Sequence, residues 1–249
     1  MPEAATVDEN KHGPLTLARW AEYDFDESLI SKYRLRDVSS AEAAEMGFSK
    51  PSDGIYIPYP QDENSRIRYH RTGFQAQTEA GKYGQRARTA PALYVPPPLI
   101  GTRELTDLAL PIVLVEGEFK AIAIDVIAND PIVRVVPLAL GGVSSWPSTK
   151  LGWDILPELN DIKWGGRHVF LAFDMDAATN PHVSLALSKL FNKLSTKGAI
   201  CRVLTWPLAE GKGVDDYLTA RGLPGEAWTE LVSRAQLPVH ILNVLEMNK

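Results

Sequence analysis

The chain has 249 residues, 45% of them hydrophobic and 23% charged, which is enough for one large or two small domains with a real core. Its net charge of −5 excludes a global basic field for nucleic acid, and its single cysteine, Cys201, excludes a disulfide framework and a cysteine-based zinc site. The longest apolar runs fall short of the roughly 20 residues that span a bilayer, and the amino terminus lacks the apolar core of a signal peptide. We therefore expect a cytoplasmic α/β protein that has no membrane partner.

The chain opens with a polar, acidic stretch, residues 1–13, which we expect to be a disordered tail. Residues 14–105 follow as the smaller of two predicted domains, of mixed α+β type. Within it, residues 54–60 and 66–71 alternate apolar and polar side chains on either side of a polar turn. This alternation is typical of two strands in a β-hairpin.

The second strand of the predicted hairpin begins the only strongly basic segment of this acidic chain, residues 66–88. It ends in a glycine-spaced loop, GKYGQRAR, that interleaves basic residues with a tyrosine. Such a segment is either a solvated surface or a surface that grips phosphates and stacks on bases. Under the second interpretation, the nucleotide- or DNA-binding candidates are Arg66, Arg68, Arg71, Lys82, Tyr83 and Arg86.

The second predicted domain, residues 106–222, alternates strand and helix patterns, which indicates a mainly parallel sheet flanked by helices. Its clearest helix is 181–197, with Asn180 as the cap, Pro181 in the first turn and Gly198 as the stop. Residues 223–249 are expected to add one or two carboxyl-terminal helices. The predicted strands of the second domain are 112–115, 133–138, 169–173 and 199–204.

Two of these apolar strands end abruptly in acidic residues. Glu116 follows the first, and Asp174 and Asp176 follow the third. The carboxyl ends of parallel strands are where open α/β sheets bind ligands. A third loop, GKGVDDYL, adds the adjacent pair Asp215 and Asp216.

Oxygen ligands of this kind suit Mg²⁺, which takes few protein carboxylates and leaves room for water and substrate phosphates. The alternative is that the acids only cap helices or pair with lysines. The adjacent glycines Gly141 and Gly142 also have two interpretations, a tight turn or a place where backbone approaches a ligand. The chain contains neither GxxxxGK[ST] nor GxGxxG, which argues against P-loop and Rossmann nucleotide sites.

A strand that runs into Glu-Gly, followed by a later strand that runs into Asp-x-Asp, resembles the TOPRIM domain of topoisomerases, bacterial-type primases and OLD-family nucleases. The TOPRIM glutamate matches Glu116, and the two aspartates match Asp174 and Asp176. The nearest likeness is to the TOPRIM-containing, primase-like proteins of phages and plasmids. In those proteins arginine-rich strands and a Lys-Tyr loop precede the TOPRIM domain, as 67–69 and 82–83 do here.

The resemblance implies a primase-type DNA-directed RNA polymerase, a nucleotidyltransferase that makes short primers on single-stranded DNA from nucleoside triphosphates. It implies a role in the DNA replication of a phage or mobile element, with a replicative helicase as a further partner. Catalysis would fall to Glu116, Asp174 and Asp176, and these acids with Asp215 and Asp216 would bind Mg²⁺ or Mn²⁺. The alternatives are a TOPRIM nuclease, in which the acids activate water, and a non-catalytic nucleic-acid-binding replication factor.

One departure from the family pattern lies inside the predicted site. Lys120 stands four residues after Glu116, where many TOPRIM primases have an aspartate. It either contacts a phosphate or replaces part of a metal site, and Lys212 is a second candidate for phosphate binding. Several acids gathered without a metal raise one another's pKa, so we expect the metal-free site to be strained.

Overall fold

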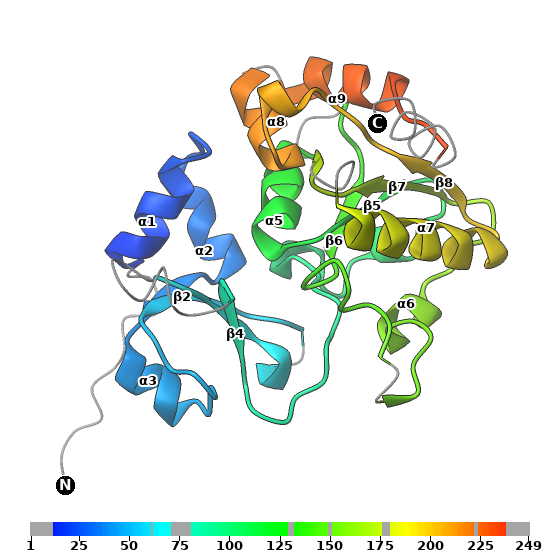
Figure 1. Ribbon diagram of the computed structural model, residues 1–249. Helices are drawn as coiled ribbons and strands as arrows, with labels where there is room; N and C mark the ends of the chain where they lie inside the picture. The colour runs from blue at the N-terminus through cyan, green and yellow to red at the C-terminus, as the bar shows by residue number, and fades with distance from the viewer. Residues whose placement is uncertain are drawn as a thin grey trace, which may run out of the picture. The chain divides into compact units, whose positions relative to one another are not determined.

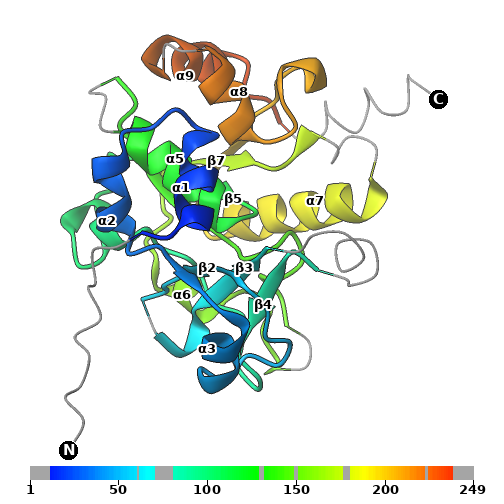
Figure 2. The ribbon, with the colours of Figure 1, turned by 90° about the vertical axis from the view of Figure 1, so that its left-hand side faces the viewer.

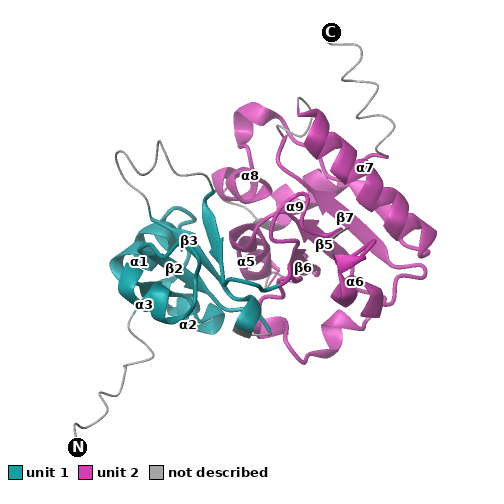
Figure 3. Ribbon diagram, turned by 60° about the horizontal axis from the view of Figure 1, so that its bottom comes forward, with its two compact units in different colours: residues 1–89 teal, residues 90–249 magenta. Residues whose placement is uncertain are grey.

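The computed structural model divides the chain into two compact units, Met1–Thr89 and Ala90–Lys249, shown in teal and magenta in Figure 3. The sequence places the domain boundary after residue 105. The structure instead assigns residues 90–105 to the second unit, in which Tyr94 and Ala139 exchange backbone hydrogen bonds of 2.8 and 3.0 Å. The described residues are 12–60, 62–70, 81–128, 132–148, 151–175, 180–221 and 224–237.

The first unit contains an antiparallel sheet, in which the neighbouring strands follow the order β1-β2-β3-β4. β2 and β3 pair with Tyr56 opposite Ile67, which confirms the predicted hairpin. Strands β2, β3 and β4 lie side by side in Figure 2. The elements of this unit are β1 (Arg36–Val38), β2 (Gly54–Ile57), β3 (Arg66–Tyr69), β4 (Tyr83–Gln85), α1 (Pro14–Ala21), α2 (Ile30–Tyr33) and α3 (Ser40–Glu45).

The side chains of β3 alternate between the core and the opposite face of the sheet. Ile67 is fully buried and packs with Val38, Tyr56 and other apolar residues. Because successive side chains of a strand point to opposite faces, Arg66 and Arg68 share the face away from this core. The hairpin therefore presents its arginines on one side, as the sequence pattern predicts.

The second unit contains a parallel sheet in the order β6-β5-β7-β8. Helices α5 and α7 lie on opposite sides of strands β5 and β7 (Figure 1). This arrangement confirms the predicted parallel sheet flanked by helices. The strands are β5 (Ile112–Val115), β6 (Val136–Ala139), β7 (His168–Ala172) and β8 (Ile200–Val203), and the helices are α5 (Glu118–Ile127), α6 (Pro157–Asp161), α7 (Pro181–Thr196), α8 (Val214–Arg221) and α9 (Pro224–Ser233).

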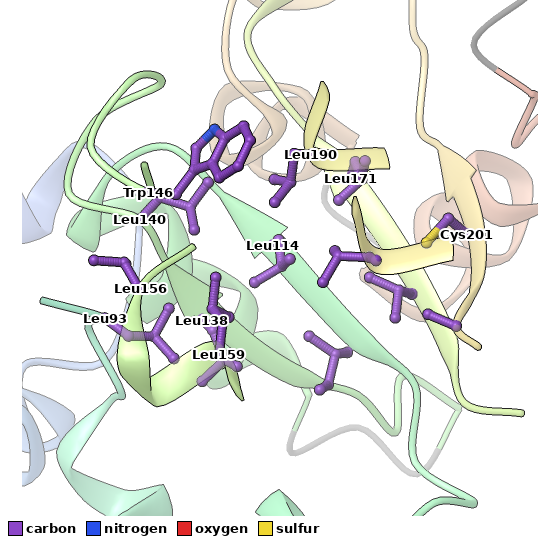
Figure 4. Close-up of a cluster of buried hydrophobic side chains, with 14 of the residues drawn as sticks. Leu93, Leu114, Leu138, Leu140, Trp146, Leu156, Leu159, Leu171, Leu190 and Cys201 are labelled. Atoms are coloured by element: carbon purple, nitrogen blue, oxygen red, sulfur yellow. The ribbon is translucent and has the colours of Figure 1, made fainter. Parts of the chain in front are cut away.

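Strands β5 and β6 are buried along their whole length and β7 is buried after His168, which is why these three strands are almost entirely apolar. On one face Leu114 and Leu171 belong to a core cluster that includes Leu190 of α7 (Figure 4). On the other face Phe170 contacts Trp228 of α9 in a T-shaped pair with ring centroids 6.0 Å apart. Burying each such side chain contributes about 2 kcal/mol relative to leaving it in water.

Helix α7 has the ends that its sequence predicts. The Asn180 side chain accepts a hydrogen bond of 3.1 Å from the His182 backbone N–H, and Pro181 occupies the first turn. Gly198 follows the helix with a φ of 91°, a conformation that glycine adopts without strain. Within the described ranges, no helix has the length and apolar content needed to cross a membrane. The carboxyl-terminal helix expected near 241–247 lies outside the described residues.

A buried arginine holds the start of the sheet together. Arg167 precedes β7 and is fully buried. Its guanidinium donates hydrogen bonds of 2.8, 2.7 and 3.0 Å to the backbone carbonyls of Leu110, Leu105 and Glu104. It therefore fastens the segment that leads into β5 to the beginning of β7, and these two strands carry the acids described below.

We predict that Arg167→Met lowers the free energy of unfolding by about 3 kcal/mol, because three backbone carbonyls, one buried and two partly buried, lose their donor together. Urea unfolding of the intact chain measures this change. Arg103→Met is the matched control, since Arg103 is exposed, and it should shift stability by less than about 0.5 kcal/mol. Equal effects of the two substitutions would contradict the role assigned to Arg167.

Candidate active site at the carboxyl edge of the parallel sheet

The pairing of β5 with β7 brings two of the predicted acids together. Val115 lies opposite Ala172 in the parallel register, so both strands end at the same level. Glu116 follows β5 directly, and Asp174 follows β7 after one further residue. The Asp174 backbone N–H donates a hydrogen bond of 3.2 Å to Glu116 Oε1. One carboxylate is thus positioned by the backbone of the other.

The loop before α8 lies against the same edge. The Met175 backbone N–H donates to the Lys212 carbonyl at 3.0 Å, which joins this loop to the residues after β7. Of the two adjacent aspartates that follow, Asp215 is 4% exposed. Asp216 is exposed, and its Oδ2 accepts a hydrogen bond of 2.9 Å from the Gly213 backbone N–H at the start of α8. Asp216 therefore caps the helix, as an acid three residues into a helix commonly does.

Two lysines pair with Asp174. Lys120 Nζ lies 3.0 Å from Asp174 Oδ1, and Lys212 Nζ lies 3.8 Å from Asp174 Oδ2. The Lys120 side chain is 19% exposed and that of Lys212 is 55% exposed, so only the first pair is well shielded from water. The structure thus brings both lysines singled out in the sequence to the acid cluster.

The surroundings of Lys120 keep its ammonium charged. Burial acts to lower the pKa of Lys120, but the negative charges of Asp215, Asp174 and Glu116 outweigh burial and raise that pKa above its usual value. A charged ammonium thus stands among three carboxylates.

Gly213 is a site residue that the sequence did not single out. A Cβ atom at this position would lie 2.1 Å from Asp215 Oδ1 and 2.9 Å from Lys120 Cε. Any other residue at position 213 would displace the side chain of Asp215 or that of Lys120. The GKG spacing signalled a special backbone, but the reason for it lies in contacts between α5 and the loop before α8.

The glycine pair after β6 forms a tight turn beside Glu116. Gly141 and Gly142 have φ values of 67° and 137°, and the Ser145 backbone N–H donates to the Gly142 carbonyl at 3.1 Å. The Gly142 N–H in turn donates to the Glu116 carbonyl at 2.7 Å. The turn therefore fixes the backbone of the catalytic candidate.

The chemistry of the donors at this edge fits one hard divalent ion. Glu116 and Asp174 supply carboxylate oxygens from neighbouring strands, and Mg²⁺ commonly uses one or two protein carboxylates with water and phosphate. Among the described residues, no group of three or more His, Cys, Asp or Glu side chains is arranged to hold a metal ion. Asp176, the third predicted ligand from the strand ends, lies outside the described residues.

The basic candidates of the first unit gather around a tyrosine. The guanidinium carbons of Arg66 and Arg68 lie 4.8 and 5.8 Å from the ring centroid of Tyr83, and Arg68 Nη1 donates to the Tyr83 hydroxyl at 3.3 Å. Lys82 beside them is exposed, whereas Arg86 is half-buried over the ring of Phe48. Arg71 lies outside the described residues. Two arginines of β3 thus lie at the ring of a tyrosine of β4, in cation–π range.

We predict that an amine-acylating reagent modifies Lys120 at least about tenfold more slowly than exposed Lys163, because its raised pKa and its burial leave little accessible neutral amine. Asp174→Asn should speed modification of Lys120 and leave Lys163 unchanged. Competitive labelling followed by mass spectrometry measures both rates. Equal rates at the two lysines in the unmodified chain would contradict the ion pair.

Comparisons with known proteins add the following. A family model described as "Domain of unknown function (DUF3854)" matches residues 104–224. No curated protein matches the chain. One similar chain belongs to the structure of the bacteriophage T7 lagging-strand DNA polymerase interacting with primase domains of two gp4 subunits, bound to an RNA/DNA hybrid and dTTP, and it is a primase domain of that complex. It is 15% identical with a TM-score of 0.42, over 82% of this chain and 94% of that one. A score of this size does not establish a shared fold.

Proposed function

We propose that this chain is a primase-like nucleotidyltransferase of the TOPRIM type, which makes short primers on single-stranded DNA during replication of a phage or mobile element. The observation that carries the proposal is the convergence of Glu116 and Asp174, from neighbouring parallel strands, beside two lysines. Acidic and basic groups at one edge suit a reaction in which a triphosphate is bound and a phosphorus–oxygen bond is exchanged.

In the proposed reaction, the primer 3′-hydroxyl oxygen bonds to the α-phosphorus of an incoming nucleotide. The bond between that phosphorus and the oxygen that bridges it to the β-phosphate breaks, and pyrophosphate leaves. A bound Mg²⁺ or Mn²⁺ supplies positive charge that polarises the phosphate oxygens. Glu116 and Asp174 would hold this ion, with Asp176 and Asp215 as the further acids of the set. Glu116 would also accept the proton of the 3′-hydroxyl.

The basic groups take the anionic parts of the substrates. The Lys212 side chain is more than half exposed at the edge, and its ammonium would contact the leaving phosphates. On the first unit, Arg66, Arg68 and Lys82 bind the phosphate backbone of the template, and Tyr83 offers a ring for base stacking. Asp216 contributes through the capping of α8.

We predict metal-dependent synthesis of short oligoribonucleotides when the protein is incubated with single-stranded DNA, ribonucleotides and Mn²⁺ or Mg²⁺. Asp174→Asn and Glu116→Gln should each lower the product yield by more than about a hundredfold, because each removes an ion-holding carboxylate. The measurement is gel analysis of labelled product, with EDTA as the metal-free reference.

The matched control for these variants is Asp154→Asn, since Asp154 lies in the same unit and its side chain is 88% exposed. This substitution should leave product yield unchanged. Template cleavage without nucleotides would instead identify a nuclease that uses the same acids. DNA binding with neither product would identify a non-catalytic factor, and both outcomes would reject the primase.

We predict that Arg66→Gln together with Arg68→Gln flattens the salt dependence of single-stranded DNA binding. The slope of log K against log salt should fall by about 1.4, because each phosphate contact contributes about 0.7. Fluorescence anisotropy at several salt concentrations measures the slope. Lys32→Gln with Lys50→Gln removes the same charge from exposed positions of the same unit and should leave the slope unchanged. An unchanged slope in the arginine variant would make the hairpin a solvated surface.

A further inference from the structure

Lys120 has an unusual position for a lysine. It lies in the first turn of α5, one helical turn beyond Glu116, and the helix begins after Gly117. From there its side chain enters the acid cluster, and Nζ lies 3.0 Å from Asp174 Oδ1 with the side chain 19% exposed. The ammonium therefore occupies the space beside Asp174 in which a bound metal ion would otherwise neutralise the charge of that carboxylate.

The cluster is built to accept this ammonium. Gly213 leaves the room in which Lys120 Cε and Asp215 Oδ1 lie, since a Cβ at that position would meet both. Asp215 is almost fully buried, and its negative charge acts on Lys120 together with those of Asp174 and Glu116. One enclosed positive charge thus lies among carboxylates that follow β5, follow β7 and begin α8.

The same arrangement limits the room for metal ions. A two-ion site places its ions about 3.5–4 Å apart and needs carboxylate oxygens that face both of them. Here Oδ1 of Asp174 faces Lys120 at 3.0 Å, and Oδ2 faces Lys212 at 3.8 Å. The Lys212 side chain is 55% exposed and its pair with Asp174 is the longer one, whereas the Lys120 side chain is 19% exposed.

We propose that Lys120 is the resident cation of this edge, which takes the place of a second divalent ion so that the site binds a single Mg²⁺ or Mn²⁺. This inference rests on the proposed function for the identity of the site, and it adds the metal stoichiometry and a role for Lys120. The ammonium is a compact point charge that can also contact a phosphate oxygen of the bound nucleotide. In a two-ion mechanism two metal ions supply positive charge to the reacting phosphate. Here one metal ion and the ammonium of Lys120 would supply it.

The test is a titration of the intact chain with Mn²⁺, in which the electron paramagnetic resonance signal of free Mn²⁺ reports how much metal is bound. The unmodified chain should bind one Mn²⁺. Lys120→Asp, which replaces the ammonium with a further ligand, should bind two. Lys120→Met should bind its ion about tenfold more tightly, because a like charge a few Å from the ion is lost. Lys163→Asp, at an exposed position of the same unit, should behave as the unmodified chain.

Two ions bound by the unmodified chain, or none, would overturn the inference, and so would no additional ion in Lys120→Asp. If Lys120→Asp does not fold, Lys120→Met decides alone, and unchanged affinity in that variant rejects the proposal. The readout does not involve primer synthesis. A chain that binds one Mn²⁺ with these responses and makes no primer would lose the proposed function and keep the role of Lys120.

Discussion

The parallel pairing of β5 with β7, with Val115 opposite Ala172, is the constraint on which the whole candidate site depends. Because both strands end at the same level, the residues after them share one edge of the sheet. Arg167 secures this register at the other end, where it binds three carbonyls of the segment before β5. The Asp174 backbone then holds the Glu116 carboxylate at 3.2 Å. Slipping either strand by one residue would separate the acids and reverse the buried face.

The charge balance at this edge follows from the same geometry. Carboxylates crowded together repel one another, and a cluster without counter-ions would be strained in the absence of metal. Lys120 and Lys212 offset this repulsion by pairing with Asp174 at 3.0 and 3.8 Å. The two lysines therefore offset part of the repulsion expected from the acids alone.

The features that sequence predicted best depend on local patterns. The apolar runs of β5 and β7 and the capped helix α7 follow from periodicity and end signals, and the acids follow from their places after the strands. What Lys120 contacts depends on how α5 packs beside the loop after β7, which no local pattern encodes. Asp215 and Asp216 are adjacent and chemically identical, yet one is buried beside Lys120 and the other caps α8.

The division of the chain was also less predictable than the strands. Residues 90–105 carry no strong strand or helix pattern, and long-range contacts attach them to the parallel-sheet unit: Tyr94 pairs with Ala139, and Arg167 binds the carbonyls of Glu104 and Leu105. The need for glycine at 213 likewise arises from side chains that come from two different helices. Both features are consequences of tertiary packing.

We propose that a divalent ion carrying a nucleotide binds at the carboxyl edge of the parallel sheet, between Glu116 and Asp174. The most direct measurement is a crystal structure with Mn²⁺ and a non-hydrolysable nucleoside triphosphate, in which anomalous scattering locates the metal. We expect one Mn²⁺ in bonding contact with Glu116 and Asp174, with Lys120 still at the edge. Manganese bound elsewhere, or two ions at this edge with Lys120 displaced, would contradict it.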